Sequence, residues 1–293
     1  MAIFTGSGVA LATPFDKNNN IDYEVYGRLV DFHLKNKTDA FIINGTTGES
    51  PTLTDEEKVE ALRFVKARVG GKVPVIAGSG TNDTEHAVKI SREAEKCGVD
   101  ALLVVTPYYN KGNDNGIYGY YKAIAASVSI PIIIYTVPGR TGVNLSVPLL
   151  KKMSQIDTIT GVKDATGNLS YTAQIAAEIP KFDIYSGNDD VVLPVISLGG
   201  KGVISVSANL IPFETHEMAV AALNNDYARA REIQLKYLPL MNALFYEVNP
   251  VPVKAALNLL GFNVGPGRSP LGPIEEKNLE ILKTLMEKLG IRL

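Results

Sequence analysis

The stretch TITGVKDATGN at residues 158–168 shows most clearly the unit that this chain repeats. Residues 158–162 are a short run of Ile, Val and Thr around one Gly, which is typical of a buried strand. Residues 164–168 are the small and polar residues of a loop that leads into a helix. Lys163 stands between the two parts. The stretch therefore predicts an ammonium group at the carboxyl end of a strand.

Similar strands recur along the chain and alternate with amphipathic segments. Helices are predicted where apolar residues return at three- and four-residue spacing, as in residues 22–37, 55–69, 84–97 and 117–127. Thr54 and Glu57 form a capping box at the start of the second of these helices. Eight runs rich in Val and Ile are predicted strands: 8–14, 40–44, 73–79, 101–106, 131–135, 158–162, 182–186 and 202–206.

Because these strands are apolar along most of their length, they predict a parallel sheet covered by helices. Eight such units favour a closed (β/α)8 barrel, the TIM-barrel fold of the α/β class. A doubly wound open sheet is the alternative. It usually has fewer strands and a glycine-rich first crossover, whereas Gly6-Ser7-Gly8 comes before the first predicted strand rather than after it.

The alternation stops near Asn225. Three further helices are predicted at 227–246, 252–260 and 274–289, separated by turns that contain Pro and Gly. We therefore expect a barrel domain over residues 1–225 and a C-terminal helical domain over residues 226–293 that packs against it.

The composition excludes several classes of function. Of the 293 residues, 45% are hydrophobic and 20% are charged, which is enough apolar material for a sizeable core. The net charge of −2, with both signs mixed, gives no electrostatic footprint for nucleic acid or an anionic membrane. We find no apolar run long enough to span a membrane and no signal-like amino-terminal segment, so we expect a cytoplasmic protein.

Metal and phosphate chemistry are not favoured either. Cys97 is the only cysteine, and His33, His86 and His216 are scattered over predicted helices, so neither an internal disulfide nor a zinc-dependent aldolase site is expected. The loop at 187–190, GNDD, is acidic where phosphate-binding barrels present glycine amides, which argues against a phosphorylated substrate or a flavin. Its carboxylates could bind a substrate amino group or cap the next helix.

Reactive groups gather at the carboxyl ends of the predicted strands, where barrels of this kind place their sites. An apolar mouth would lower the pKa of Lys163 by desolvation and make its amine a nucleophile, which suits a Schiff base. An ion-paired or solvated lysine is the alternative. Tyr135 ends a run of isoleucines, and its hydroxyl could move protons or merely find a partner at the rim.

Two segments could bind carboxylates. The turn GTTG at 45–48 can direct backbone N–H groups and the hydroxyls of Thr46 and Thr47 at an anion, although an ordinary glycine turn has a similar sequence. Arg140 offers a planar fork for a second carboxylate, although many loop arginines are solvated or in weak surface ion pairs.

Six motifs, spread over essentially the whole chain, resemble those of the 4-hydroxy-tetrahydrodipicolinate (dihydrodipicolinate) synthases. They are GTTGES at 45–50, TPYYN at 106–110, YTVPGRTG at 135–142, GVKDATGN at 161–168, GVISV at 202–206 and NPVPVK at 249–254. The resemblance implies a (β/α)8 barrel with a C-terminal helical domain and a lyase of the class I aldolase type in lysine (diaminopimelate) biosynthesis. Such enzymes condense pyruvate with L-aspartate 4-semialdehyde through a covalent imine on a lysine, with no other cofactor and no metal. The resemblance also implies a homotetramer built as a dimer of tight dimers.

The matched motifs imply roles for single residues. Lys163 would form the imine with pyruvate. Tyr135, Thr46 and Tyr109 would relay protons, with Tyr109 reaching into the neighbouring subunit's site. The implied substrate-binding residues are Thr47 for the pyruvate carboxylate, Arg140 for the semialdehyde carboxylate, Ile204 beside the lysine, and Gly187. Thr136 and Asp164 depart from the commoner Asn and Glu, and Thr136 leaves open how the Arg140 loop is braced.

The resemblance also implies where the pathway product, L-lysine, would bind in feedback-sensitive relatives. The matching positions include Ser50, Asn82, His86 and Tyr108. His86 replaces a glutamate that pairs with the cationic effector, and Lys58 replaces a histidine. A buried ammonium without its carboxylate is costly, so we expect weak or no inhibition by lysine unless Asp55 compensates.

Two other functions remain open at this point. N-acetylneuraminate lyase and other 2-keto-acid aldolases share the lysine and the tyrosine, although Arg140 and the double-threonine turn favour the synthase. Outside the enzymes, a non-catalytic keto-acid or amino-acid binding protein is the alternative, but a binding protein needs neither an imine-forming lysine nor a proton relay.

Overall fold

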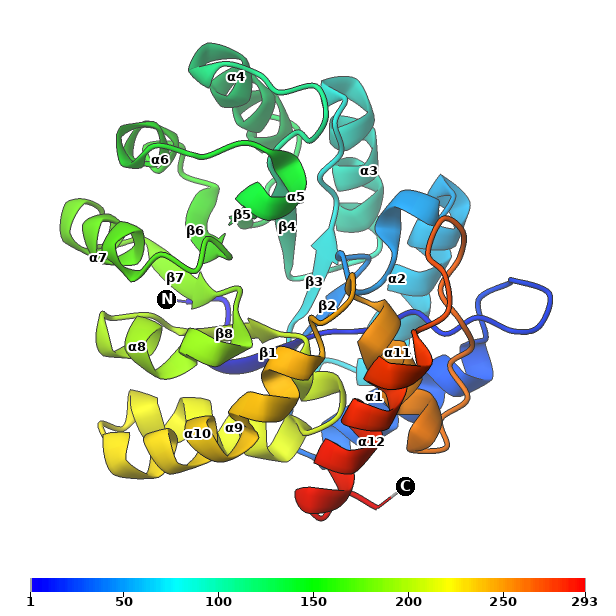
Figure 1. Cartoon of the computed structure of the whole chain (residues 1–293). Coiled ribbons are helices and arrows are strands. Elements are labelled where there is room, and N and C mark those ends of the chain that lie inside the picture. Colours follow the sequence, from blue (N-terminus) through cyan, green and yellow to red (C-terminus); the bar gives the residue numbers. More distant parts are fainter. Residues whose placement is uncertain (1, 293) are drawn as a thin grey trace.

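The structure, a computed structural model, describes residues 2–292. Eight parallel strands close into a barrel in chain order, and the last strand pairs with the first. Helices cover the outside of the strands (Figure 1). The predicted (β/α)8 barrel is therefore confirmed and the open sheet is excluded. The strands are β1 (Gly6–Ala10), β2 (Ala40–Ile43), β3 (Val75–Gly78), β4 (Ala101–Val105), β5 (Ile132–Thr136), β6 (Ile159–Asp164), β7 (Asp183–Ser186) and β8 (Gly202–Ser205).

Nine α-helices of the described residues accompany the strands, and three more follow. The first nine are α1 (Tyr23–Lys35), α2 (Asp55–Val69), α3 (Thr84–Lys96), α4 (Asp114–Ala125), α5 (Pro138–Thr141), α6 (Val147–Met153), α7 (Leu169–Glu178), α8 (Val192–Ser197) and α9 (Pro212–Leu223). The predicted capping box is present, because Thr54 Oγ1 accepts from Glu57 N at 3.2 Å and Glu57 Oε2 accepts from Thr54 N at 2.9 Å. Helix α4 begins earlier than predicted, since the side chain of Asn113 caps it.

Strand boundaries differ more from the prediction. The first strand is Gly6–Ala10 rather than 8–14, so Gly6-Ser7-Gly8 lies within it and not before it. Gly6 pairs with Gly202 of β8, where a Cβ on Gly202 would lie 1.9 Å from Gly6 O. The closing of the barrel thus places backbone against backbone at a point where only glycine fits.

The side chains of the strands form two apolar layers. One layer fills the barrel and includes Ile133, Tyr135, Tyr185 and Ile204. The other lies between the strands and the helices and includes Ile134 and Val162. Successive side chains of a strand point to opposite faces. Because Val162 of β6 belongs to the outer layer, the next residue, Lys163, points into the barrel.

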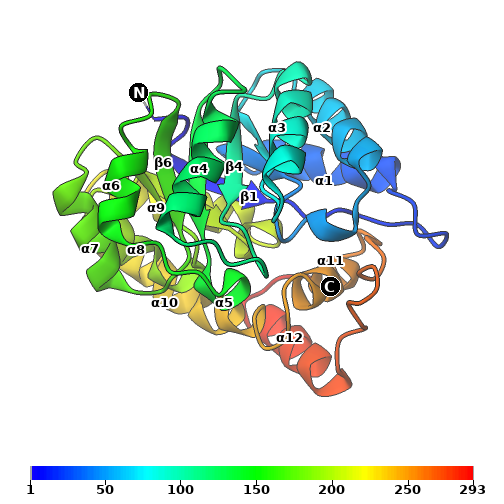
Figure 2. The same cartoon turned by 90° about the horizontal axis from the view of Figure 1, so that it is seen from above.

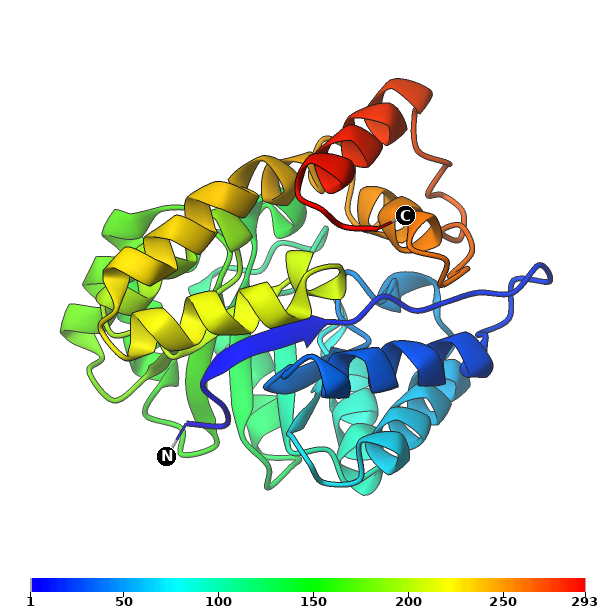
Figure 3. The same cartoon turned by 90° about the horizontal axis from the view of Figure 1, so that it is seen from below.

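Three helices follow the barrel: α10 (Tyr227–Ala243), α11 (Val251–Leu259) and α12 (Glu276–Lys288). Helix α10 packs along α9, and α12 packs on α10 and α11. Figure 2 shows α11 and α12 together on one side of the barrel. In Figure 3 the arrowhead of β1 (blue) points toward the side where α11 (orange) and α12 (red) lie. The C-terminal helices therefore lie near the carboxyl ends of the strands.

Candidate active site

Lys163 and Tyr135 are adjacent at the carboxyl ends of two neighbouring strands. In the register of β5 and β6, Tyr135 is opposite Lys163. Both side chains are buried, with 5% of Lys163 and 7% of Tyr135 exposed. The Lys163 Nζ lies 4.3 Å from the centre of the Tyr135 ring. The lysine therefore meets an aromatic face, and no acidic side chain of the described residues forms a salt bridge with it under 4.0 Å.

One cavity joins most of the residues predicted for the site. Thr46, Thr47, Tyr135, Arg140, Lys163 and Gly187 all line it. Its other wall comes from the segment between α10 and α11, residues 245–249. Ile204 is fully buried in the barrel interior with Tyr135 and does not line this cavity, whereas Val206 does. The sequence did not single out residues 245–248, because a wall contributed by a distant helix pair leaves no local pattern.

The turn after β2 is the segment predicted to bind a carboxylate. Within residues 2–292, the backbone N–H groups of Thr46 and Thr47 have no backbone hydrogen-bond acceptor. The N–H group of Glu49 donates to Thr46 O. Glu49 has a left-handed backbone conformation, φ 57°. Unpaired N–H groups in such a turn form a concave anion site. The Gly48 carbonyl accepts from Thr13 Oγ1 at 2.8 Å, which ties the turn to the segment after β1.

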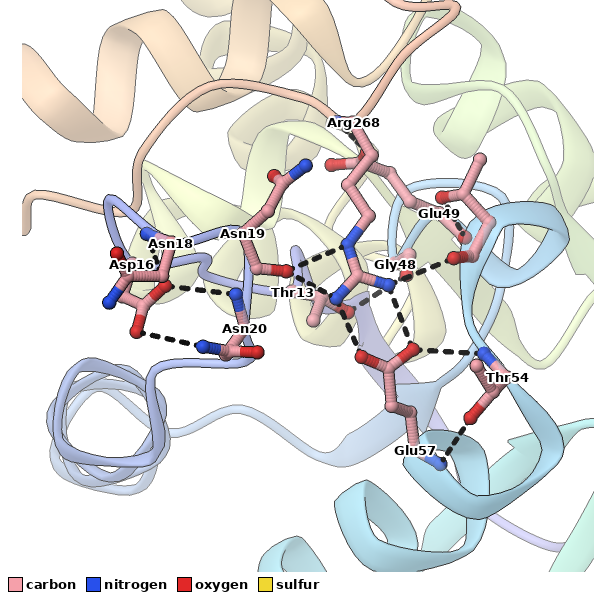
Figure 4. Close-up of polar contacts among 11 residues, drawn as sticks. Thr13, Asp16, Asn18, Asn19, Asn20, Gly48, Glu49, Thr54, Glu57 and Arg268 are labelled. Carbon is pink, nitrogen blue, oxygen red and sulfur yellow. Dashed lines mark hydrogen bonds and ion pairs between the residues drawn. The ribbon is translucent and has the colours of Figure 1, made fainter.

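A buried ion pair anchors this turn to the C-terminal helices. Glu49 Oε1 accepts from Lys254 Nζ at 2.7 Å, and the two side chains are 1% and 2% exposed. Glu49 Oε2 accepts from the backbone N–H of Arg268 at 2.8 Å. Arg268 in turn forms a fork with Glu57 and donates to the carbonyl of Asn19 (Figure 4). It also donates to the carbonyl of Thr52. The carboxylate that follows the anion-binding turn is thus held from both sides.

Asn249 connects two of the predicted binding residues. Its Nδ2 donates to Thr47 Oγ1 at 3.0 Å, and its backbone carbonyl accepts from Arg140 Nη2 at 2.9 Å. Arg140 belongs to the short helix α5 and is otherwise exposed. Asn249, Lys254 and Arg268 lie about 200 positions from the turn that they contact, so no spacing in the sequence could have linked them to it.

Tyr109 lies apart from the cavity. Its side chain is 89% exposed and its backbone has φ 65°, a conformation that is uncommon for a bulky residue. The preceding Tyr108 is half-buried, and burial raises the pKa of its hydroxyl. A second hollow, which shares Thr46, Tyr135 and Arg140 with the first, is lined by Tyr108 and Ser50. Among the described residues, Tyr109 therefore lines neither of these two hollows.

Only part of the predicted effector pocket comes together in one chain. Ser50 and Tyr108 line the same hollow, whereas Asn82 and His86 do not. His86 Nε2 is 2.8 Å from Asp55 Oδ1, and Lys89 Nζ donates to Asp55 Oδ2 at 2.7 Å. The bond from Lys89, together with that from His86, lowers the pKa of Asp55. Burial lowers the pKa of Lys58, and Asp55 offsets this in part.

One carboxylate of the acidic loop after β7 forms hydrogen bonds within the protein. Asp189 is buried, and its Oδ2 accepts from the N–H groups of Val206 and Ser207 at 3.0 and 2.8 Å. Burial raises the pKa of this carboxyl. Asp189 therefore braces the loop after β8. Asp190 is exposed.

The two positions that depart from the commoner motif have different surroundings. Asp164 accepts from Thr166 N and Oγ1 and from Thr172 Oγ1, so it orders the start of α7. Thr136 is fully buried, and its Oγ1 has no partner within residues 2–292. Arg140 is instead held by its hydrogen bond to the backbone carbonyl of Asn249. This contact shows how the Arg140 loop is braced when Thr136 stands in place of the commoner Asn.

The histidines have partners away from the cavity. His33 Nδ1 lies 2.9 Å from Thr38 Oγ1, and His216 Nδ1 lies 2.8 Å from Asp39 Oδ2. In the described part of the chain, no three His, Cys, Asp or Glu side chains are grouped as metal ligands would be. Likewise, no helix among residues 2–292 has the length and apolar character to cross a membrane.

A closed barrel whose mouth holds a buried lysine, a tyrosine and an anion-binding turn defines a (β/α)8-barrel enzyme of the lysine-dependent aldolase type. Comparison with known proteins specifies the family. The chain belongs to the dihydrodipicolinate synthetase family, whose sequence model matches residues 3–289.

Full-length relatives agree with this assignment. The chain is 53% identical over 293 residues to a 4-hydroxy-tetrahydrodipicolinate synthase of Caldicellulosiruptor saccharolyticus, covering 100% of this chain and 99% of the relative. A crystal structure of dihydrodipicolinate synthase from Aquifex aeolicus has a TM-score of 0.97 and 43% identity, with 99% of each chain covered. The enzyme of Acinetobacter baumannii, solved as a pyruvate complex, has a TM-score of 0.96 and 39% identity over 98% of this chain and 99% of that one.

Proposed function

We propose that this enzyme condenses pyruvate with L-aspartate 4-semialdehyde to give 4-hydroxy-tetrahydrodipicolinate, a step of lysine biosynthesis. The observation that supports it most directly is the single cavity in which Lys163, Tyr135, the Thr46–Thr47 turn and Arg140 meet. The names of the full-length relatives support the same reaction. Arg140 favours an acceptor with its own carboxylate, which distinguishes the semialdehyde from a neutral aldehyde.

The reaction follows from the position of each group. Lys163 attacks C2 of pyruvate, and loss of water gives an imine while the turn after β2 holds the carboxylate. Removal of a proton from C3 gives the enamine, whose C3 attacks the aldehyde carbon. The acceptor's amino group then replaces Lys163 at C2, which closes the ring and frees the lysine. One water is released overall, and pyruvate needs no cofactor beyond its bond to Lys163.

Tyr135 and Thr46 are placed to move protons in these steps. Both residues line the cavity that Lys163 also lines, and Tyr135 packs in the apolar interior of the barrel. Tyr109 would complete the relay from a neighbouring subunit, because it is exposed and does not line the cavity of its own chain. The proposal therefore includes a homotetramer made of two tight dimers. We propose the cytoplasm as its location, in line with the composition of the chain.

An assay with three substrates tests the proposed function. Purified protein is given pyruvate with L-aspartate 4-semialdehyde, pyruvate with N-acetylmannosamine, or N-acetylneuraminate alone. We expect turnover only in the first reaction, measured as formation of the cyclic product. Preferred cleavage of N-acetylneuraminate would instead assign the chain to the lyases, and binding of pyruvate without turnover of any acceptor would support a binding protein.

Removal of either tyrosine hydroxyl is expected to slow the reaction. Tyr135→Phe and Tyr109→Phe should each lower kcat by about a hundredfold, because a positioned proton donor and acceptor typically contributes this much. Tyr118→Phe, on the outer helix α4, is the matched control and should stay near the wild-type rate. Steady-state kinetics with both substrates measures all three variants, and an unchanged kcat in Tyr135→Phe would remove that residue from the relay.

If Tyr109 serves the site of the neighbouring subunit, two inactive variants should complement each other. Chains with Tyr109→Phe and chains with Lys163→Ala are each defective, but in a hybrid dimer one of the two sites receives both an intact lysine and an intact tyrosine. Mixing the unfolded chains and refolding them should therefore restore activity above that of either variant. Hybrids verified by mass spectrometry that remain inactive would show that Tyr109 serves its own chain.

Lysine is expected to inhibit this enzyme weakly or not at all. Asp55 is the carboxylate that could replace the missing glutamate, but His86 and Lys89 already bind both of its oxygens. A cationic effector would have to displace them, and the buried Lys58 would repel it. Titration of the wild type with L-lysine at pH 8 should show little loss of rate at submillimolar concentrations. His86→Glu should raise the sensitivity, and strong inhibition of the wild type would contradict the prediction.

A further inference from the structure

The segment between α10 and α11 holds one side chain that is buried at the wall of the cavity. Asn249 is 5% exposed, whereas its neighbours Phe245, Tyr246 and Val248 are about half exposed. Its Oδ1 is buried and has no hydrogen-bond partner within residues 2–292. An unsatisfied buried amide oxygen is costly, so a side chain kept in this place needs a compensating role. The hydrogen bond of its Nδ2 supplies such a role, and its backbone carbonyl makes a second contact to the site.

The first bond acts on the turn that holds the pyruvate carboxylate. Asn249 Nδ2 donates to Thr47 Oγ1, and Thr47 is itself only 1% exposed. A hydroxyl has one proton and two lone pairs. Because the amide N–H occupies a lone pair, the hydroxyl proton stays available and is turned away from Asn249. The bond therefore leaves the Thr47 hydroxyl free to donate to a carboxylate held by this turn.

The second bond acts on the group that would bind the other carboxylate. Arg140 Nη2 donates to the backbone carbonyl of Asn249 at 2.9 Å. A guanidinium has five N–H donors in a planar fork, so one bond to a carbonyl fixes its plane and leaves the others free. Since Arg140 is otherwise exposed, this contact limits where its fork can point.

We propose that Asn249 is a positioning residue that aligns the two carboxylate-binding groups of the site, Thr47 and Arg140, with each other. This inference rests on the proposed function. Through Asn249, the segment between α10 and α11 thereby takes part in orienting the groups that bind substrate. The ion pair of Lys254 with Glu49 holds the other end of the same turn. The turn is therefore attached to the segment after α10 at both Thr47 and Glu49.

The side-chain bond can be removed without changing the backbone contact to Arg140. Asn249→Ala should raise the KM for pyruvate about five- to tenfold, since a neutral hydrogen bond contributes about this factor. The pyruvate concentration for half-maximal borohydride trapping of Lys163, without acceptor, should rise equally. Asn249→Asp has the same shape but can only accept when ionised, and its charge repels the substrate carboxylate, so it should raise both values about a hundredfold.

Two comparisons separate positioning from general damage. Asn258→Ala removes a similar amide bond, Asn258 Nδ2 to Gly265 O at 3.2 Å, from the same domain and should leave both values within about twofold of wild type. In a Thr47→Val background, Asn249→Ala should have no further effect, because the hydroxyl on which it acts is absent.

The outcomes distinguish this inference from the function on which it rests. If the wild type traps pyruvate and Asn249→Ala and Asn249→Asp trap it at the same concentration, Asn249 has no positioning role. If Asn249→Ala raises the KM for pyruvate equally in the wild-type and Thr47→Val backgrounds, the positioning role is also overturned. If the wild type itself traps no pyruvate on Lys163, the proposed function fails instead.

Discussion

Replacement of Lys163 by arginine is expected to lower turnover by about three orders of magnitude or more. Arginine keeps the positive charge at the end of β6, but its guanidinium stays protonated and cannot form an imine with pyruvate. Lys163 is only 5% exposed and lies against the Tyr135 ring. Among the described residues, no other lysine lines this cavity, so none is positioned to replace it. The loss should appear in kcat rather than in the melting temperature.

Borohydride trapping directly measures whether Lys163 forms the imine with pyruvate. Wild-type protein with pyruvate and borohydride should gain one reduced pyruvate per chain, and peptide mapping should place it on Lys163. Lys201→Arg is the matched control, because Lys201 precedes β8 at the opposite end of the barrel from the cavity. It should keep both the label and the rate. Label on a different lysine, with Lys163 unmodified, would overturn the mechanism.

Breaking the buried ion pair is expected to cause the largest loss of stability. Lys254→Met leaves the Glu49 carboxylate, 1% exposed, without its ammonium partner. Burial lowers the pKa of Lys254 and Glu49 opposes that shift, so each charge depends on the other. An uncompensated buried charge typically costs about 3–5 kcal/mol. We expect a decrease of that size in the free energy of unfolding, measured by urea denaturation.

A double replacement tests the cause. Lys254→Met with Glu49→Gln removes both charges and retains an amide oxygen for the Arg268 N–H, so it should be more stable than Lys254→Met alone. The exposed pair of Lys96 and Glu93 provides the control, since Lys96→Met should change the stability by less than about 1 kcal/mol. Equal losses in the single and double variants would show that packing, rather than charge, explains the effect.

The sequence predicted the features whose cause is local. Apolar runs and helical spacing are properties of a few neighbouring residues. They predicted the eight strands, the first four helices around the barrel and the start of α2. The sequence also placed Lys163 near the carboxyl end of a strand, although β6 continues through Lys163 to Asp164 instead of ending at residue 162. That Tyr135 lies opposite Lys163 depends on the register between β5 and β6, which the sequence did not predict. The division into domains at residue 225 stays a prediction.

The tertiary structure decided what depends on distant parts of the chain. Strand ends are set by hydrogen bonds to the neighbouring strand, so β1 begins at Gly6 because Gly202 of β8 pairs with it. The support of the anion-binding turn depends on Asn249 and Lys254, which come from about 200 residues away. Local propensity cannot specify such contacts. They arise because barrel closure brings the carboxyl ends of all strands to one face, where the C-terminal helices then pack.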